Sequence, residues 1–265
     1  MLTTTPRRVL AAVMGLGLLV VYLPLAIVLV NSFNSSRTFA WPPSELTTHW
    51  WSQAWLSTGA RSALRTSIFA GLGATAVALV LGTMAAFAVS RYRWFGRESV
   101  SFLLLLPIAL PGIVTGIALN NAFRVAGTGF GLLTIIVGHS TFCVVLVYNN
   151  ALARLRRLGG TLEEASMDLG AGVWQTFRYV TFPLLRSALF AGGLLAFALS
   201  FDEIIVTTFT SAPGVQTLPL WIFGNLFRPN QAPVVNVVAA ALIVLSVLPV
   251  WLAQRLSGEP VGARH

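Results

Sequence analysis

The sequence contains no lysine and little charge of either sign. Only 9% of its 265 residues are charged, whereas a soluble domain carries about a quarter. All 17 basic residues are arginine. The missing lysines exclude a Schiff-base lysine and the lysine of a conventional phosphate-binding P-loop. One cysteine, Cys143, excludes an internal disulfide and a CxxC metal site. The three histidines are too far apart in the chain for a metal-ligand motif.

The sequence instead contains several long uncharged segments. Hydrophobic residues make up 56% of the chain, and a membrane-spanning helix needs about 20 of them in a row. The first run follows two arginines, as in a signal peptide, but it is too long for one and no cleavage site precedes a soluble domain. We therefore predict an all-α membrane protein, with residues 1–265 forming a single domain and six transmembrane helices near 9–30, 66–90, 99–123, 131–152, 187–210 and 234–253.

The arginines predict the orientation of these helices. With the N-terminus inside, 12 arginines fall in inner segments and 4 in outer segments, while Arg65 sits at a helix start. An excess of arginine marks the cytoplasmic side of a membrane protein. Both termini are therefore predicted to be cytoplasmic. The net charge of +9 reflects this bias, so we expect a lipid bilayer and no nucleic acid as a partner.

Tryptophans gather in the first outer segment, residues 31–61. Trp51 and Trp55 are four residues apart and so share one face of a helix. One interpretation is an interfacial helix anchored by aromatic side chains. The other is a role in gating or solute contact, for which Trp50 is the candidate.

The cytoplasmic segment 153–186 has the pattern of a structured elbow. A short helix is predicted before Gly170, which suits a helix end with positive φ. A second amphipathic stretch follows, and Pro183 is expected to limit its helical continuity. Such an elbow is either a docking site for a soluble partner or an ordinary juxtamembrane helix.

The spacing of this elbow resembles the EAA motif of ABC importer permeases, EAA-x3-G-x9-I-x-LP. Here it reads Glu164-Ala165-Ser166, Gly170 and then Val180-Thr181-Phe182-Pro183, with mild departures at Ser166, Val180 and Phe182. In that family the loop carries a coupling helix that docks into an ATPase subunit. The resemblance therefore assigns ATPase coupling to Glu163, Glu164, Ala165, Ser166, Asp168, Leu169, Gly170 and Pro183.

Four other segments are similar to the PotC/YdcV branch of spermidine/putrescine-type permeases, the inner membrane components of binding-protein-dependent transport. They are VNSFNSSR (30–37), RYRWFGR (91–97), GHSTFCVV (138–145) and SFDEIIVTTF (200–209). The resemblance implies a type I ABC importer permease fold in a bacterial inner membrane. It implies a second permease subunit, two ATPase subunits and a substrate-binding protein as partners. ATP and magnesium would belong to the ATPases, so this chain would have no cofactor and would not be an enzyme. Polyamine permeases often carry an acid where Gly112 stands.

Two adjacent acids interrupt the fifth run. Asp202 and Glu203 follow fifteen uncharged residues, which places them roughly 22 Å along the helix. A carboxylate at that depth costs a few kcal/mol. With Ser200, they are predicted to line the pathway and attract a cation. Alternatively, they pair with an arginine of the partner permease or lie near water. His139 is expected to form an interhelix hydrogen bond rather than a proton relay.

These features favour a transport subunit over other membrane proteins. An intramembrane enzyme would need a catalytic set at one depth, and a self-gated channel or receptor would not need the elbow. The expected function is ATP-driven import of putrescine, spermidine or a related amine-bearing solute by alternating access. γ-Aminobutyrate or another small organic ion remains open as the solute.

Overall fold

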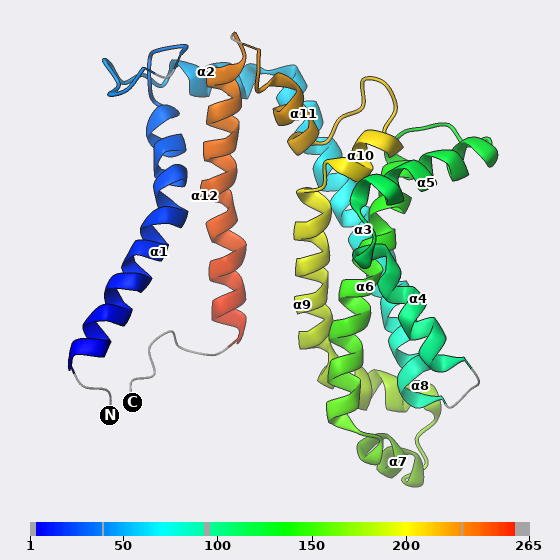
Figure 1. Ribbon diagram of the computed structural model, residues 1–265. Coiled ribbons are helices and arrows are strands. Elements are labelled where there is room, and N and C mark those ends of the chain that lie inside the picture. The colour runs from blue at the N-terminus through cyan, green and yellow to red at the C-terminus, as the bar shows by residue number, and fades with distance from the viewer. Residues whose placement is uncertain (1–3, 39, 93–95, 229, 258–265) are drawn as a thin grey trace. The chain divides into compact units, whose positions relative to one another are not determined.

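A computed structural model describes residues 4–38, 40–92, 96–228 and 230–257 of the chain (Figure 1). Within these residues the regular structure is helical, apart from one isolated bridge between Asn34 and Leu46. The chain divides into two compact units, Met1–Arg61 with Ile222–His265, and Ser62–Trp221. The helices are α1 (Thr4–Asn31), α2 (His49–Leu56), α3 (Thr58–Arg91), α4 (Arg97–Ala109), α5 (Gly112–Val125), α6 (Leu132–Leu158), α7 (Thr161–Asp168), α8 (Val173–Thr176), the π-helix η1 (Phe177–Thr181), α9 (Phe182–Phe201), α10 (Ile205–Thr210), α11 (Leu218–Asn225) and α12 (Ala232–Ser257).

The lengths of these helices support the prediction of an all-α membrane protein. Among the described residues, four helical segments are long and apolar enough to cross a bilayer: Arg8–Asn31, Thr58–Arg91, Leu132–Leu158 and Val173–Phe201. The bent pair of α4 and α5 would be a fifth, and the apolar α12 follows near the C-terminus. The predicted count of six is supported only in outline.

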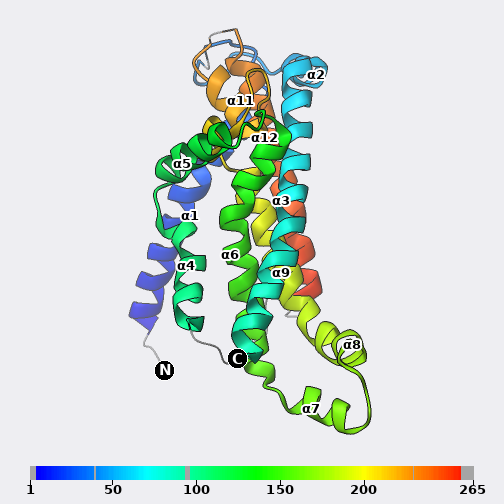
Figure 2. The same ribbon diagram turned by 90° about the vertical axis from the view of Figure 1, so that its right-hand side faces the viewer.

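The third predicted helix, residues 99–123, is wrong as a continuous element. The structure has α4 and α5 in its place, bent by 105° at Leu110 and Pro111 (Figure 2). Proline disfavours a helical conformation in the residue before it, and Leu110 is extended at φ −79° and ψ 143°. Pro107, in contrast, lies inside α4. The break therefore belongs to the second proline alone.

The fifth predicted helix also differs from the structure at both of its ends. It stops at Phe201, and Asp202 and Glu203 lie in a break before α10 rather than within a helix. At its start, the helical segment continues unbroken through Pro183, against expectation. The π-helix η1 precedes this proline, and the Phe182 amide bonds five residues back to the Phe177 carbonyl. This wider turn lets the helix absorb a residue that has no N–H to donate.

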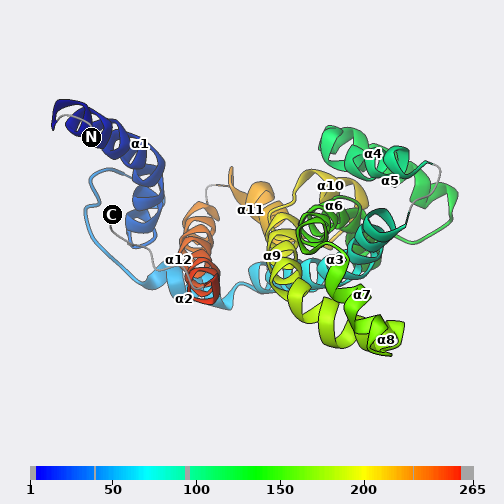
Figure 3. The same cartoon turned by 90° about the horizontal axis from the view of Figure 1, so that it is seen from below.

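Helix α6 forms the centre of the unit Ser62–Trp221, where it packs along α9 and against α4 and α10 (Figure 3). Small residues allow the close approach of α3: Ala74 and Ala78 are fully buried against Phe142 and Cys143. At Gly82 an added Cβ would lie 2.9 Å from the Val144 carbonyl oxygen. Close helix contact through small residues is the usual packing mode inside a membrane.

The unit formed by the two ends of the chain packs α1 and α2 against α12. The Asn236 amide donates to the Val28 carbonyl at 2.9 Å, so a polar side chain links two apolar helices. The predicted tryptophan helix is α2, and Trp55 on it is 76% exposed. Trp50 is half-buried, and its indole N–H donates to the Asn34 carbonyl at 3.0 Å.

Candidate functional site

The predicted elbow forms one end of the unit Ser62–Trp221, with α10 at the other end (Figure 1). Helix α7 ends at Asp168, and Gly170, two residues further on, has a φ of +86°, which confirms the predicted turn. The Gly170 amide donates to the Met167 carbonyl, and the Ala171 amide donates to the Ser166 carbonyl. This pair of bonds is a Schellman motif, which stops a helix and turns the chain. A Ser166–Thr176 hydroxyl contact of 3.1 Å then joins α7 to α8.

The elbow presents apolar side chains that the chain itself leaves uncovered. We call this set the elbow surface, and its exposed fractions range from 45% at Met167 to 91% at Leu169. Its first three residues lie on or directly after α7, beyond the arginine-rich end of α6, whereas Val173 and Trp174 open the apolar helical segment Val173–Phe201. Exposed apolar patches at such places mark interaction sites. The elbow surface consists of Leu162, Met167, Leu169, Val173 and Trp174.

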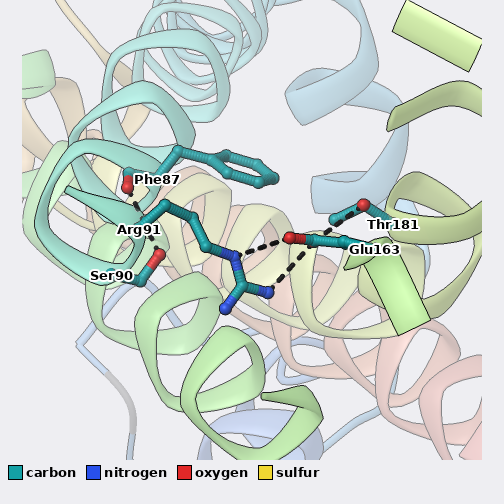
Figure 4. Close-up of polar contacts among 5 residues, drawn as sticks. All are labelled: Phe87, Ser90, Arg91, Glu163 and Thr181. Atoms are coloured by element: carbon teal, nitrogen blue, oxygen red, sulfur yellow. Dashed lines mark hydrogen bonds and ion pairs between the residues drawn. The ribbon is translucent and has the colours of Figure 1, made fainter. Parts of the chain in front are cut away.

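The acids of α7 divide between two faces. Glu164 and Asp168 are exposed, as is Ala165, and they can contact a partner directly. Glu163 instead turns inward: its Oε2 lies 2.9 Å from Arg91 Nε, and its Oε1 accepts from Arg91 Nη2 at 3.0 Å. The Thr181 hydroxyl also donates to Glu163 Oε1 at 2.8 Å (Figure 4). We call these three residues the Arg91 cluster.

Asp202 and Glu203, at the other end of the unit, also differ in their surroundings. Glu203 is half-buried, and its Oε1 accepts from the Val206 amide at 2.8 Å, within the first turn of α10. A carboxylate is stabilised at that position by the free amides of a helix start. Asp202 is exposed, and within the described part of the chain its carboxylate has no hydrogen-bond or ion-pair partner. The free carboxylate of the pair is therefore Asp202.

Buried hydroxyls and one imidazole hold this break in place. His139 is fully buried, with Nδ1 at 2.8 Å from the Ser200 hydroxyl and Nε2 at 2.9 Å from the Thr207 hydroxyl. Ser200 belongs to α9 and Thr207 to α10, so the ring bridges the two sides of the break. The structure thus gives His139 the hydrogen bonds between helices that its sequence context predicts. Ser200, predicted to line the pathway, is only 1% exposed.

Sequence reasoning missed a cavity of about 430 Å³ between α5, α10 and the segment after it. Arg124 lines this cavity, donates from Nε to Asn120 Oδ1 at 2.8 Å and lies over the Phe130 ring. Asn120 in turn donates to the Phe209 carbonyl. The four-residue spacing of Asn120 and Arg124 on one helix face was the available signal. None of the described residues that line the cavity is acidic.

The remaining predicted residues lie in separate places. Trp50 belongs to the terminal unit, whereas Ser200, Asp202 and Glu203 belong to the other. Residues 93–95, within the segment 91–97, lie outside the described residues. Among the residues that the structure describes, no group of three His, Cys, Asp or Glu side chains could hold a metal ion.

Comparison with known proteins places these features in a family. Residues 78–258 match the family model described as "Binding-protein-dependent transport system inner membrane component". The chain is 32% identical to the putrescine transport system permease protein PotI of Escherichia coli strain K12, covering 90% of this chain and 86% of PotI. It is 33% identical to the spermidine/putrescine transport system permease protein PotC of the same organism, covering 90% of this chain and 89% of PotC.

A solved structure supports the fold independently. A chain of a bacterial ABC transporter involved in the import of the acidic polysaccharide alginate superposes with a TM-score of 0.73, covering 99% of both chains at 17% identity. This match confirms the predicted ABC importer permease fold. The relatives are permease subunits, which are not themselves enzymes. With its elbow, its apolar helices and these relatives, the chain belongs to the family of inner membrane components of binding-protein-dependent transport systems.

Proposed function

We propose that this chain is one of two permease subunits of an ATP-driven importer, with both termini in the cytoplasm. Two ATPase subunits would bind ATP and magnesium, and a soluble binding protein would deliver the solute. Closure of the ATPase dimer would draw the two elbows together and turn the pore from inward-facing to outward-facing. Hydrolysis would return it and release the solute inside.

The observation that carries this proposal is the elbow surface. Five apolar side chains remain exposed on α7, the turn after it and the start of α8, and three of them (Leu162, Met167 and Leu169) precede the apolar segment Val173–Phe201. A groove on an ATPase subunit would cover them, while Glu164 and Asp168 would face its rim. Apolar side chains surrounded by polar ones are the usual anatomy of a protein interface.

Two equally exposed apolar residues allow a matched test. Leu169 on the elbow and Val125 at the end of α5 are both 91% exposed. Leu169→Asp would place a charge inside the ATPase interface, where an unpaired charge is strongly unfavourable. We expect at least roughly tenfold weaker capture of the ATPase subunits, equivalent to about 1.4 kcal/mol. Val125→Asp should leave capture unchanged. Equal capture by both variants would contradict docking at the elbow.

For the solute, we infer a small amine-bearing molecule such as putrescine or spermidine. The names of PotI and PotC point to this class, and the exposed carboxylate of Asp202 suits an ammonium group. A charge-assisted hydrogen bond contributes about 1.5–3 kcal/mol. Asp202→Asn keeps the shape of the side chain and removes its charge, so putrescine uptake into proteoliposomes should fall roughly tenfold or more.

Glu203→Gln is the matched control for this experiment. Its amide oxygen can still accept from the Val206 amide, so we expect the smaller loss of uptake. ATPase assembly should stay normal in both variants. If both transport putrescine at wild-type rates, the acids do not contact the solute. If Asp202→Asn separates the permease subunits, the carboxylate pairs with an arginine of the partner permease instead.

The Arg124 cavity favours a second candidate, a solute that carries both an amine and a carboxylate. An arginine held by Asn120 and Phe130, with no acid among the described residues of the cavity, would repel a diamine and attract a carboxylate. γ-Aminobutyrate has the same number of carbons as putrescine and carries a carboxylate where putrescine has its second aminomethyl group. If it is the solute, Arg124→Gln should lower its uptake selectively. If putrescine is the solute, the same substitution should not impair uptake.

A further inference from the structure

The Arg91 cluster joins three elements that are far apart in the sequence. Arg91 is the last residue of α3, Glu163 lies in the first turn of α7, and Thr181 is the last residue of η1. The Glu163 carboxylate contacts both of the others, as Figure 4 shows, at distances of 2.8 to 3.0 Å. It is therefore a junction between the elbow and two helical segments of the transmembrane region.

The charged side chains at this junction are half-buried. The Arg91 and Glu163 side chains are 21% and 19% exposed, whereas the other two carboxylates of α7 are exposed. Glu164 and Asp168 are four residues apart and share the outward face of the helix. Glu163 is the acid that faces the protein. The ATPase would meet Glu164 and Asp168, and Glu163 would remain with Arg91.

The Arg91–Glu163 pair combines one hydrogen bond with a close charge contact. Arg91 Nη2 donates to Glu163 Oε1 at 3.0 Å, while Nε lies 2.9 Å from Oε2 without forming a hydrogen bond. A charge-assisted hydrogen bond of this kind is stronger than one between neutral groups. A ring contact supports it: Phe87 on α3 meets Phe177 on η1 edge-to-face at 5.8 Å. When α7 moves, the Arg91–Glu163 pair holds the end of α3 to it, and the ring contact holds α3 to η1.

We propose that Glu163 is a positioning residue that transmits the movement of α7 to α3 and, through Thr181, to the η1–α9 segment. This proposal rests on the proposed function, in which the ATPase moves the elbow. Its consequence is specific: a permease without the Glu163 link still binds the ATPase through the elbow surface, but ATP hydrolysis no longer drives α3. Hydrolysis then continues with little solute transported.

The test uses the complete importer in proteoliposomes, with putrescine as the probe and the solute transported per ATP hydrolysed as the readout. Glu163→Gln and Arg91→Gln should each lower this ratio roughly tenfold or more, since each removes charge-assisted bonds. ATPase co-purification should stay at the wild-type level. Thr181→Val removes one of the three contacts and should give a smaller loss. Arg157→Gln, an exposed arginine at the end of α6, is the charge-matched control.

A charge swap separates transmission from simple stabilisation. Arg91→Glu combined with Glu163→Arg restores an ion pair between α3 and α7, so it should recover most of the ratio that either single reversal loses. If Glu163→Gln reduces only the yield or thermal stability of the complex, with an unchanged ratio, the link is structural and the proposal fails. If Glu163→Gln loses the ATPase, Glu163 is a docking residue and the proposal also fails. If the proposed function itself is wrong, the result differs from both of these outcomes: the wild-type chain already captures no ATPase.

Discussion

The break between α9 and α10 depends on one buried imidazole, and its hydrogen bonds predict a tautomer. The Thr207 hydroxyl donates its proton to the Glu203 carbonyl at 2.9 Å. It must therefore accept from His139, which places the ring proton on Nε2 and leaves Nδ1 to accept from the Ser200 hydroxyl. The network is complete only with a neutral ring in this tautomer.

Replacing His139 by leucine keeps a similar volume and removes both bonds. The Ser200 hydroxyl loses its partner inside the protein, which costs about 1–3 kcal/mol. Thr207 keeps its bond to Glu203 and loses only an accepted bond, at about 0.5–1.5 kcal/mol. We therefore expect the free energy of unfolding to fall by about 1.5–4.5 kcal/mol. Because Asp202 lies in the break that these bonds hold, the KM for solute uptake should also rise.

The assay is equilibrium unfolding of the detergent-solubilised chain, extended to a double-mutant cycle with Ser200→Ala. Removing the stranded hydroxyl from the His139→Leu variant should recover part of the loss, since apolar replacement of both partners is nearly neutral. Thr141→Val is the control, because among the described residues its hydroxyl bonds only to the Gly138 carbonyl on its own helix. If the loss of unfolding free energy in the double variant equals the sum of the losses in His139→Leu and Ser200→Ala, the two residues are not coupled and the network is refuted.

The transmembrane architecture was largely predictable from the sequence because lipid imposes one strong requirement. A spanning segment must be apolar over its length, so uncharged runs located α1, α3, α6 and α12. The ends were less accurate: α3 begins at Thr58 and α6 continues to Leu158, and both include arginines. Long basic side chains near a helix end reach water, so charge alone does not mark where a helix stops.

The breaks in the helices were harder to predict because neighbouring residues of the same type behave differently. Pro107 stays inside α4 while Pro111 ends it, and nothing local in the sequence separates the two. The acids Asp202 and Glu203 signalled a departure from an ordinary span. In the structure α9 ends at Phe201, before the two acids. Glu203 then accepts a hydrogen bond from the α10 backbone, which offsets the free-energy cost of removing its carboxylate from water.

The two parts of the elbow also differed in how far the sequence revealed them. The turn at Gly170 is local, and its motif spacing predicted it. The Arg91–Glu163 contact joins residues 72 positions apart in the sequence, and it depends on how α3 and α7 pack. The sequence therefore placed Glu163 among the ATPase-coupling residues without separating it from Glu164. Only the packed structure distinguishes the inward carboxylate from the outward one.

Further predictions concern packing, topology and the elbow turn. Gly82→Ala should destabilise the chain by about 1–3 kcal/mol in the same unfolding assay, because the new Cβ meets α6 backbone at 2.9 Å; Gly15→Ala, with open space around it, should not. Cysteines at Ser44 and Thr161 in a cysteine-free background should react differently with an impermeant thiol reagent in intact cells, only the first being labelled. At Gly170 no atom lies within 4 Å of an added Cβ, so a side chain would not crowd the turn. The penalty is the backbone at φ +86°, about 1–2 kcal/mol for most residues. Asparagine tolerates this conformation far better than valine. Gly170→Val should therefore misplace the elbow surface and reduce ATPase capture, while Gly170→Asn retains most of it. Equal losses in the two variants would mean that the glycine serves the interface by its small size, not the turn by its conformation.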